Sequence, residues 1–136
     1  MREILFRGID KSSCKWVYGD LLQRDEGRKI KAIMPPYPAK KGIVVKEDSI
    51  GQYTGLTDKN GTKIFEGDII RTKAFGKNIK TGVNCADYDI FQVTFKWSGF
   101  HLENNEREFS LSVTSKSYYE IIGNIHDNPE LLKEAE

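Results

Sequence analysis

The sequence predicts a mainly β, antiparallel fold with an SH3-like barrel portion over about residues 50–126. An N-terminal β-hairpin region of about residues 1–48 precedes the barrel portion, and a short helix of about residues 129–135 follows it. Three observations lead to this prediction. Short segments of branched and aromatic residues alternate with polar residues. Clusters of Gly, Asn, Asp and Pro separate those segments. The clearest helix start signal lies near the C-terminal end.

The length and composition predict one domain, residues 1–136. The hydrophobic content of 38% and the charged content of 30% are ordinary for a soluble globular chain. The aromatic content of 11% excludes a chain that is disordered throughout. A chain of this length buries roughly two thirds of its unfolded surface, so it needs no metal or disulfide to fold.

The charges are unevenly distributed, although the net charge is only +1. Residues 1–50 carry 11 basic and 7 acidic side chains, whereas residues 101–136 carry 3 basic and 8 acidic ones. The near-neutral total gives no general argument for binding nucleic acid. A solvated surface with an acidic tail explains the asymmetry. A basic face opposite an acidic one, suited to a polyanion or to head-to-tail self-association, is the alternative.

The cysteines and the N-terminus indicate the compartment. Cys14 and Cys85 stand far apart, and no CxxC or Cys/His spacing occurs, so we expect neither a zinc site nor a disulfide framework. The apolar run Ile4–Phe6 ends at Arg7 and is too short for a signal peptide. No apolar run approaches the roughly 18 residues of a membrane span. We therefore expect a cytoplasmic protein with reduced thiols, no cofactor and no membrane partner.

The N-terminal region is predicted to contain three strands. Residues 4–9 form the first, and Trp16–Leu22 and Arg28–Ile33 form the next two, joined by a hairpin at Arg24–Gly27. Three prolines in Pro35–Pro38 then end regular structure, because they remove backbone donors. The structural interpretation of this segment is a stiff connector. The functional alternative is a ligand for an aromatic groove on another protein.

The central stretch, Ile50–Lys73, is the densest run of turn and strand residues in the chain. A short strand at Ile43–Val45 and a turn at Glu47–Ser49 lead into it. Asp58–Gly61 predicts a tight hairpin loop, because Asn and Gly accept positive φ. Glu66–Asp68 predicts a sharp bend between two strand segments, so that the chain covers one core twice.

The segment from Ala74 to Asp87 is predicted to be a long irregular loop. Lysines 73, 77 and 80, with Phe75 among them, resemble a crude polyanion-binding finger. A solvated loop that protects a sheet edge explains the same residues. Both interpretations stay open at the level of sequence.

Ile90–Trp97 is the clearest strand. Aromatic and branched residues alternate with polar ones, which predicts that the apolar side chains lie in the core. A base-stacking surface is the alternative. The expected core side chains are Phe91, Val93, Phe95 and Trp97.

Later segments are predicted to complete the sheet. Strands are expected at residues 100–102, 109–113 and 118–125, after turns at Ser98–Gly99 and Asn104–Asn105.

The expected helix follows the last strand. Asn128 suits the N-cap, Pro129 the first helical position and Glu130 the positive end of the helix dipole. A helix of about two turns is marginal alone, so we expect Leu131 and Leu132 to dock it on the sheet or on a neighbouring subunit.

Candidate catalytic residues are few. His101 and His126 are the two histidines, and no G-x-S-x-G motif, phosphate loop or dinucleotide fingerprint accompanies them. The paired carboxylates flank a Gly bend or a strand start, where they are explained as turn residues. They are Glu66 with Asp68 and Asp87 with Asp89. The sequence therefore favours a non-enzymatic protein, with no catalytic, cofactor-binding or metal-binding residue assigned.

Three separated blocks resemble the YopX family of phage and prophage proteins. The opening block is Arg2–Arg7, the central block is Ile50–Ile69 with IGQYTGL, DKNG and IFEGDI, and the closing block is Glu120–Leu132 with EIIGNI and NPELL. The blocks follow the family's order and span the whole chain. The family's opening often has FRAWD where this chain has FRGID at residues 6–10, a difference that concerns the packing of the first strand.

The resemblance implies a small phage-derived protein of the bacterial cytoplasm with an SH3-like barrel portion, and it implies no catalytic residues. The leading hypothesis is a non-enzymatic phage accessory protein that binds a macromolecular partner, either another protein or a second copy of itself. The first alternative is a small β-barrel that binds nucleic acid through Lys73, Lys77 and Lys80. The second is a hydrolase that uses the carboxylates of Glu66 and Asp68.

Overall fold

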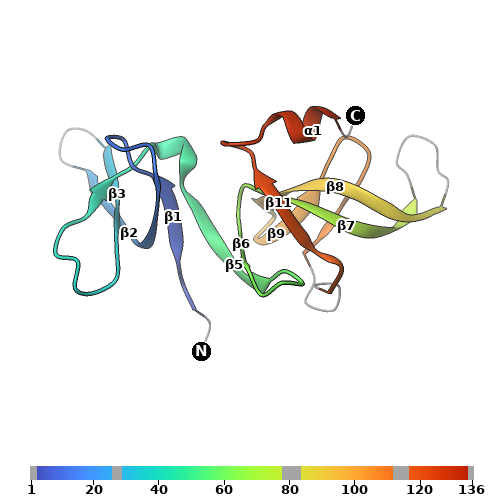
Figure 1. Ribbon diagram of the computed structural model, residues 1–136, viewed down its shortest axis with the longest axis horizontal. Helices are drawn as coiled ribbons and strands as arrows, with labels where there is room; N and C mark the ends of the chain where they lie inside the picture. Colours follow the sequence, from blue (N-terminus) through green and yellow to red (C-terminus); the bar gives the residue numbers. More distant parts are fainter. Residues whose placement is uncertain (1–2, 26–28, 78–83, 112–116, 135–136) are drawn as a thin grey trace. The chain divides into compact units, whose positions relative to one another are not determined.

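The chain forms two compact units, Met1–Gly55 and Leu56–Glu136, in a computed structural model (Figure 1). The strands pair antiparallel in both units, and a short α-helix lies near the C-terminal end. The prediction of a mainly β, antiparallel fold with a short C-terminal helix is confirmed. The single-domain assignment stays a prediction. The described residues are 3–25, 29–77, 84–111 and 117–134.

The first unit is a sheet with the strand order β4-β3-β2-β1-β5. The predicted hairpin is present, with Leu21 opposite Ile33 and Leu22 opposite Ala32. The proline-rich segment carries no strand, as predicted. The elements are β1 (Phe6–Ile9), β2 (Trp16–Asp25), β3 (Lys29–Met34), β4 (Ile43–Val44), the 3-10 helix η1 (Glu47–Ser49) and β5 (Gly51–Thr57), which runs on into the second unit.

This sheet curls until the ends of β1 and β4 meet. Asp10 bridges Val45, and the backbone amide of Lys46 donates to the carbonyl of Ile9 at 2.9 Å. The side chains of Ile9, Ile33 and Val45 are buried inside the curl. Burial of these three side chains stabilises the unit by about 1.5–3 kcal/mol each.

Gly19 in β2 is required by a close backbone approach. A Cβ atom at this position would lie 1.9 Å from the carbonyl oxygen of Met34, the last residue of β3. No side chain fits there unless the two strands separate.

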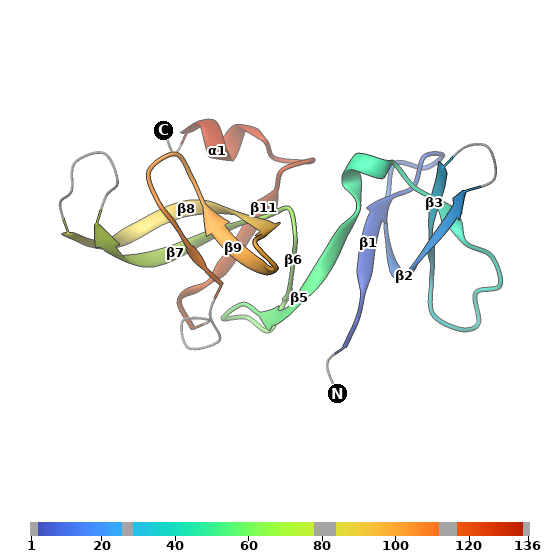
Figure 2. The ribbon, with the colours of Figure 1, turned by 180° about the vertical axis from the view of Figure 1, so that it is seen from behind.

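The second unit contains a five-stranded sheet with the order β10-β9-β8-β7-β11 (Figure 2). In the described residues β10 and β11 are its two edges, so this sheet is open and closure into an SH3-like barrel stays a prediction. The elements are β6 (Lys63–Phe65), β7 (Asp68–Lys77), β8 (Asn84–Lys96), β9 (Gly99–Glu103), β10 (Glu108–Ser110), β11 (Glu120–Asn124) and α1 (Glu130–Glu134).

The core of the second unit confirms half of the predicted aromatic stripe. Phe91 and Val93 are fully buried, but Phe95 is 52% exposed and Trp97 is 77% exposed, so their placement in the core was wrong. The period-two pattern holds along β8, but the core ends before the strand does. Trp97 also leaves the strand for a turn, where alternation no longer applies. The buried cluster is Ile64, Ile70, Phe91, Val93, Leu102 and Tyr119.

The predicted hairpin loop is present and is organised by the buried side chain of Asp58. Its Oδ1 accepts hydrogen bonds from the backbone amides of Asn60 and Thr62, at 2.9 and 3.0 Å. Its Oδ2 accepts one from the backbone amide of Ile121 in β11, at 3.1 Å. One carboxylate therefore shapes the loop and attaches it to a strand 63 residues away in sequence.

The predicted bend at Gly67 is also present, with φ at +92°. The backbone amide of Gly67 donates to the carbonyl of Val93, and its carbonyl accepts from the amide of Ile125, both at 2.9 Å. Glycine adopts this φ without steric cost. The bend can therefore hydrogen-bond to β8 through Val93 and to the residue after β11, Ile125.

Part of the predicted irregular loop is regular, so that prediction was wrong at both ends. Ala74–Lys77 continues β7 and Asn84–Asp87 begins β8, and these residues pair in register. Apart from Phe75 the sequence there is poor in strand-forming residues, and pairing with the neighbouring strand stabilises the extended conformation instead. Residues 78–83 lie outside the described part of the chain.

The side chain of Asn128 does not cap the helix as expected. Its Oδ1 accepts from the backbone amide of Asn124 at 3.3 Å. Gly123 makes room for this contact, because a Cβ there would lie 2.6 Å from Oδ1 of Asn128. The asparagine therefore joins the approach to the helix with the end of β11.

We predict that Gly19→Ala lowers the free energy of unfolding by about 2–3 kcal/mol, because the methyl group overlaps the Met34 carbonyl. Gly42→Ala is the matched control, since its methyl group would meet the flexible end of Leu22 at 3.1 Å. Urea unfolding followed by circular dichroism measures both. Equal losses in the two variants would contradict the role assigned to Gly19.

We predict that Asp58→Ala lowers the free energy of unfolding by about 3 kcal/mol, because backbone amides lose a buried acceptor. Asp58→Asn should lose less, since one oxygen remains. Asp10→Ala is the control, because the Asp10 carboxylate accepts a hydrogen bond from the backbone amide of Ser12 on an exposed turn. A loss at Asp58 no larger than the loss at Asp10 would show that the buried carboxylate does not hold the loop.

Candidate functional site

The lysines of the predicted polyanion-binding finger are not gathered in one loop. Lys73 lies within β7, opposite Tyr88, and is half-buried. Lys77 ends β7, and only its backbone is described, as for Phe75, which pairs with Ala86. Lys80 lies outside the described residues. Nucleic-acid binding through these lysines stays a prediction.

In each carboxylate pair, one aspartate accepts a hydrogen bond from a backbone amide. Asp68 is buried, and its Oδ2 accepts from the amide of Phe65 at 2.7 Å, while Glu66 is half-buried. Asp89 accepts from its neighbour's backbone amide and from the side chain of Asn104, at 2.8 and 3.0 Å. The backbone of Asp87 pairs with β7. The hydrolase alternative stays a prediction with no further support from these contacts.

The two histidines contact Asn124 and Glu108. The backbone of His126 donates to Oδ1 of Asn124, and Nδ1 of His101 lies 3.7 Å from a carboxylate oxygen of Glu108. No three His, Cys, Asp or Glu side chains of the described residues gather closely enough to hold a metal ion. Among the same residues there is no helix with the length and hydrophobicity that crossing a bilayer requires.

Trp97 stands at the tip of the β8–β9 hairpin. Lys96 pairs with Gly99, so Trp97 and Ser98 form a two-residue loop, and their φ angles are +52° and +62°. Positive φ at both positions is the geometry of a type I′ turn, which normally takes Asn and Gly. A tryptophan in this place is both strained and 77% exposed.

A charged cluster beside Trp97 fixes one face of this tip. The ammonium of Lys96 lies 4.7 Å from the centre of the Trp97 ring. It also bonds to the carboxylates of Glu103 and Glu108, at 2.5 and 2.8 Å. The Trp97 ring meets His101 edge to face, with ring centres 5.6 Å apart. The contact with Glu103, followed by that with Glu108, raises the pKa of Lys96 above its ordinary value.

The opposite face of the same hairpin carries Phe95 and Phe100. They are directly paired across β8 and β9, with ring centres 5.1 Å apart at 67°. Since Phe95 is half exposed, the hairpin presents aromatic surface on both of its faces. Exposed aromatic rings of this kind are enriched at protein interfaces.

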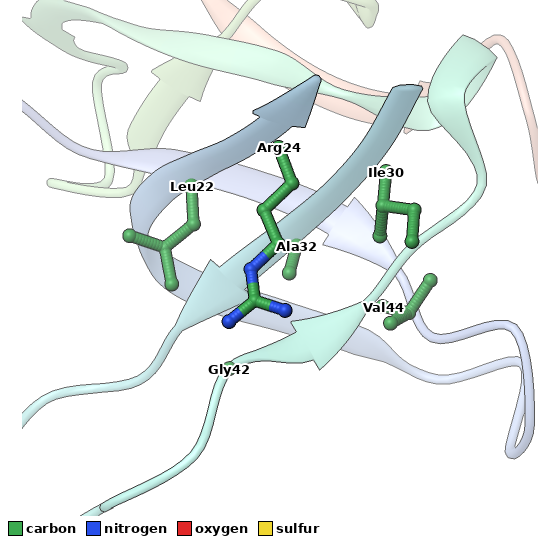
Figure 3. Close-up of a pocket in the computed structure, with 6 residues that line it drawn as sticks. All are labelled: Leu22, Arg24, Ile30, Ala32, Gly42 and Val44. Carbon is green, nitrogen blue, oxygen red and sulfur yellow. The ribbon is translucent and has the colours of Figure 1, made fainter. Parts of the chain in front are cut away.

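A pocket of about 300 Å³ lies on one face of β2, β3 and β4 in the first unit (Figure 3). Leu22 and Val44 are both 42% exposed there. Figure 3 shows the side chain of Arg24 extended between Leu22 on one side and Ile30 and Val44 on the other. Among the described side chains that line the pocket, Arg24 is the charged one, and the others are apolar.

The sequence contained a signal for both features. Leu21 and Leu22 are adjacent, and adjacent residues of a strand face opposite ways, so one of the two must face outward. Trp97 stands directly before Ser98–Gly99, which marks a turn and so places the tryptophan at the end of the strand.

A family model described as YopX protein matches residues 5–133 of the chain. The chain belongs to the YopX family. The resemblance to the YopX family that the sequence showed is therefore confirmed. A search of the curated proteins finds no match.

One solved structure supports the fold of this family member. The crystal structure of protein EF1440 from Enterococcus faecalis is 25% identical to the chain, covering 97% of the chain and 99% of that protein, with a TM-score of 0.52. The similarity extends over both units, so the arrangement of strands within the chain recurs in that protein.

We predict that Glu103→Gln lowers the pKa of Lys96 more than Glu108→Gln does, because the contact with Glu103 is the larger cause of its elevation. A raised pKa stabilises the fold fully below the ordinary value of 10.5, and the stabilisation is lost as the pH rises through the folded-state pKa. NMR titration of the Lys96 side chain measures the pKa. Identical titrations in the wild type and both variants would show that Glu103 and Glu108 do not raise the pKa of Lys96.

Proposed function

We propose that this YopX-family member is a non-enzymatic accessory protein of a phage or prophage that acts by binding another protein. The observation that carries the proposal is Trp97, which is 77% exposed at a turn position where φ is +52°. We place its action in the cytoplasm of the bacterial host as part of the same proposal.

The free energy that the conformation and exposure of Trp97 cost the fold supports this function. A non-glycine residue in the left-handed region costs about 1–3 kcal/mol, and such residues cluster at functional sites. The exposed ring of Trp97 also leaves a large apolar side chain in contact with water. Tryptophan is enriched among the residues that dominate binding energy at protein interfaces. A partner that buries Trp97 would remove this apolar surface from water, and the binding energy would offset the cost of the backbone conformation.

The surroundings of Trp97 suit a protein partner. Lys96 holds one face of the ring, and Phe95 adds apolar surface on the other side of the hairpin. The cation is shared with two carboxylates, so the tip is not a basic patch. A neutral aromatic tip with a charged rim resembles the centre and rim of a protein interface.

We predict that p-benzoylphenylalanine at position 97 crosslinks to one discrete protein in the bacterial cytoplasm after illumination. Position 37 is the matched control, because Tyr37 is 94% exposed but lies in the proline-rich connector. Excess unlabelled wild type should suppress the adduct. Trp97→Asn should compete roughly thirtyfold less well, since a buried tryptophan contributes about 2 kcal/mol or more at an interface.

The mass of the adduct identifies the class of partner. An increase of 15.6 kDa would indicate a second copy of this chain, and another discrete mass would indicate a different protein. Equal labelling from positions 97 and 37, or no discrete adduct from either, would overturn the proposal.

A further inference from the structure

We propose that the pocket on the outer face of β2, β3 and β4 binds a peptide segment of a partner protein in which an aliphatic side chain stands next to a carboxylate. The inference rests on the proposed protein-binding function and names the chemistry of the partner. It uses residues of the first unit only, whereas Trp97 belongs to the second.

The apolar part of the pocket follows from the strand register. Leu22, Ala32 and Val44 lie opposite one another across the three strands, so their side chains share one face of the sheet. Ile30 lies opposite Arg24 and belongs to the same face. The volume of about 300 Å³ is at the lower end of the range for binding pockets, which suits one or two side chains rather than a large ligand.

Gly42 keeps the pocket open. A Cβ at this position would lie 3.1 Å from Cδ1 of Leu22 and 3.4 Å from Cβ of Ala32. A larger side chain at position 42 would therefore occupy the space over these two residues. The φ of Gly42 lies outside the left-handed region that favours glycine, so a substitution there fills the pocket without straining the backbone.

Arg24 supplies the charge of the pocket. In the described part of the chain no ion pair or hydrogen bond engages its guanidinium, which Figure 3 shows directed toward Gly42. A guanidinium matches a carboxylate with two parallel hydrogen bonds, and its weak hydration lowers the cost of burying it. Lys40 and Lys41, both exposed, directly precede Gly42 and add positive charge there, whereas Asp25 and Glu26 directly follow Arg24 in the sequence.

The positive charge of Arg24 therefore favours a carboxylate in the bound peptide. The apolar lining favours an aliphatic side chain beside that carboxylate. None of the described residues that line the pocket is aromatic, so they offer no stacking surface of the kind on which nucleic-acid bases bind. A segment with a Leu beside a Glu would place its methyl groups against Leu22, Ala32 and Val44 and its carboxylate on Arg24.

The test uses NMR spectra of the full chain titrated with three synthetic peptides. They are acetyl-Glu-Leu-Leu-Glu-amide, acetyl-Lys-Leu-Leu-Lys-amide and acetyl-Glu-Ser-Ser-Glu-amide. The acidic leucine peptide should shift the signals of Leu22, Ala32 and Val44, with an affinity roughly tenfold higher than the other two peptides. Gly42→Val should abolish these shifts.

Arg24→Glu should abolish the preference for the acidic peptide, and Arg24→Lys should restore part of it. Lys15→Glu is the matched control, because it makes the same charge change at an exposed position outside the pocket. Circular dichroism confirms that each variant folds, and Leu22→Ser replaces Gly42→Val if that variant does not.

Equal shifts from the acidic and basic peptides, or no shifts from any of them, would overturn the inference. So would equivalent shifts from a decathymidine oligonucleotide, which would indicate a nucleic-acid site. Shifts of the same signals that depend on protein concentration alone would indicate a second copy as the occupant, and they would also overturn it. A discrete adduct at position 97 without peptide binding would leave the proposed function intact, whereas failure of both would remove it.

Discussion

The second unit depends on one buried carboxylate. Asp58 accepts hydrogen bonds from two amides of its own loop and from a third in β11. A hairpin loop and a distant strand are thereby joined through a single side chain, and charge-assisted hydrogen bonds of this kind are stronger than neutral ones. The Gly67 bend adds backbone bonds to Val93 and Ile125. Together these contacts bring the central stretch and the closing stretch of the family signature into one structure.

Local turn chemistry explains why much of the fold could be predicted from the sequence. The loop at Asp58–Gly61 and the bend at Gly67 need residues that accept positive φ, and those residues are visible in the sequence. The extent of the core is not visible there. Phe95 has the same local pattern as Phe91, but only the position of neighbouring strands decides that one is buried and the other is not. The long pairing of β7 with β8 likewise depends on tertiary contacts. The glycine and asparagine residues near the ends of these two strands do not predict it.

The candidate sites could be predicted less well than the fold. Lysines, paired carboxylates and histidines attract notice in a sequence because their chemistry is familiar. In the structure, the described carboxylates of Asp58, Asp68 and Asp89 accept hydrogen bonds from backbone amides. The surfaces that support a binding function are instead made of ordinary residues in unusual places, such as Trp97 in a tight turn and Leu22 on an outer sheet face.

The contact between Gly19 and Met34 also determines how β2 and β3 align. Leu21 and Leu22 are equally hydrophobic, so sliding one strand past the other by a single residue would exchange them with little change in buried apolar area. Such a slide would bring Tyr18 or Asp20 against the Met34 carbonyl, where there is no space for a Cβ atom. Steric exclusion therefore provides the alignment that hydrophobicity alone leaves ambiguous, and it keeps Leu22 rather than Leu21 facing outward.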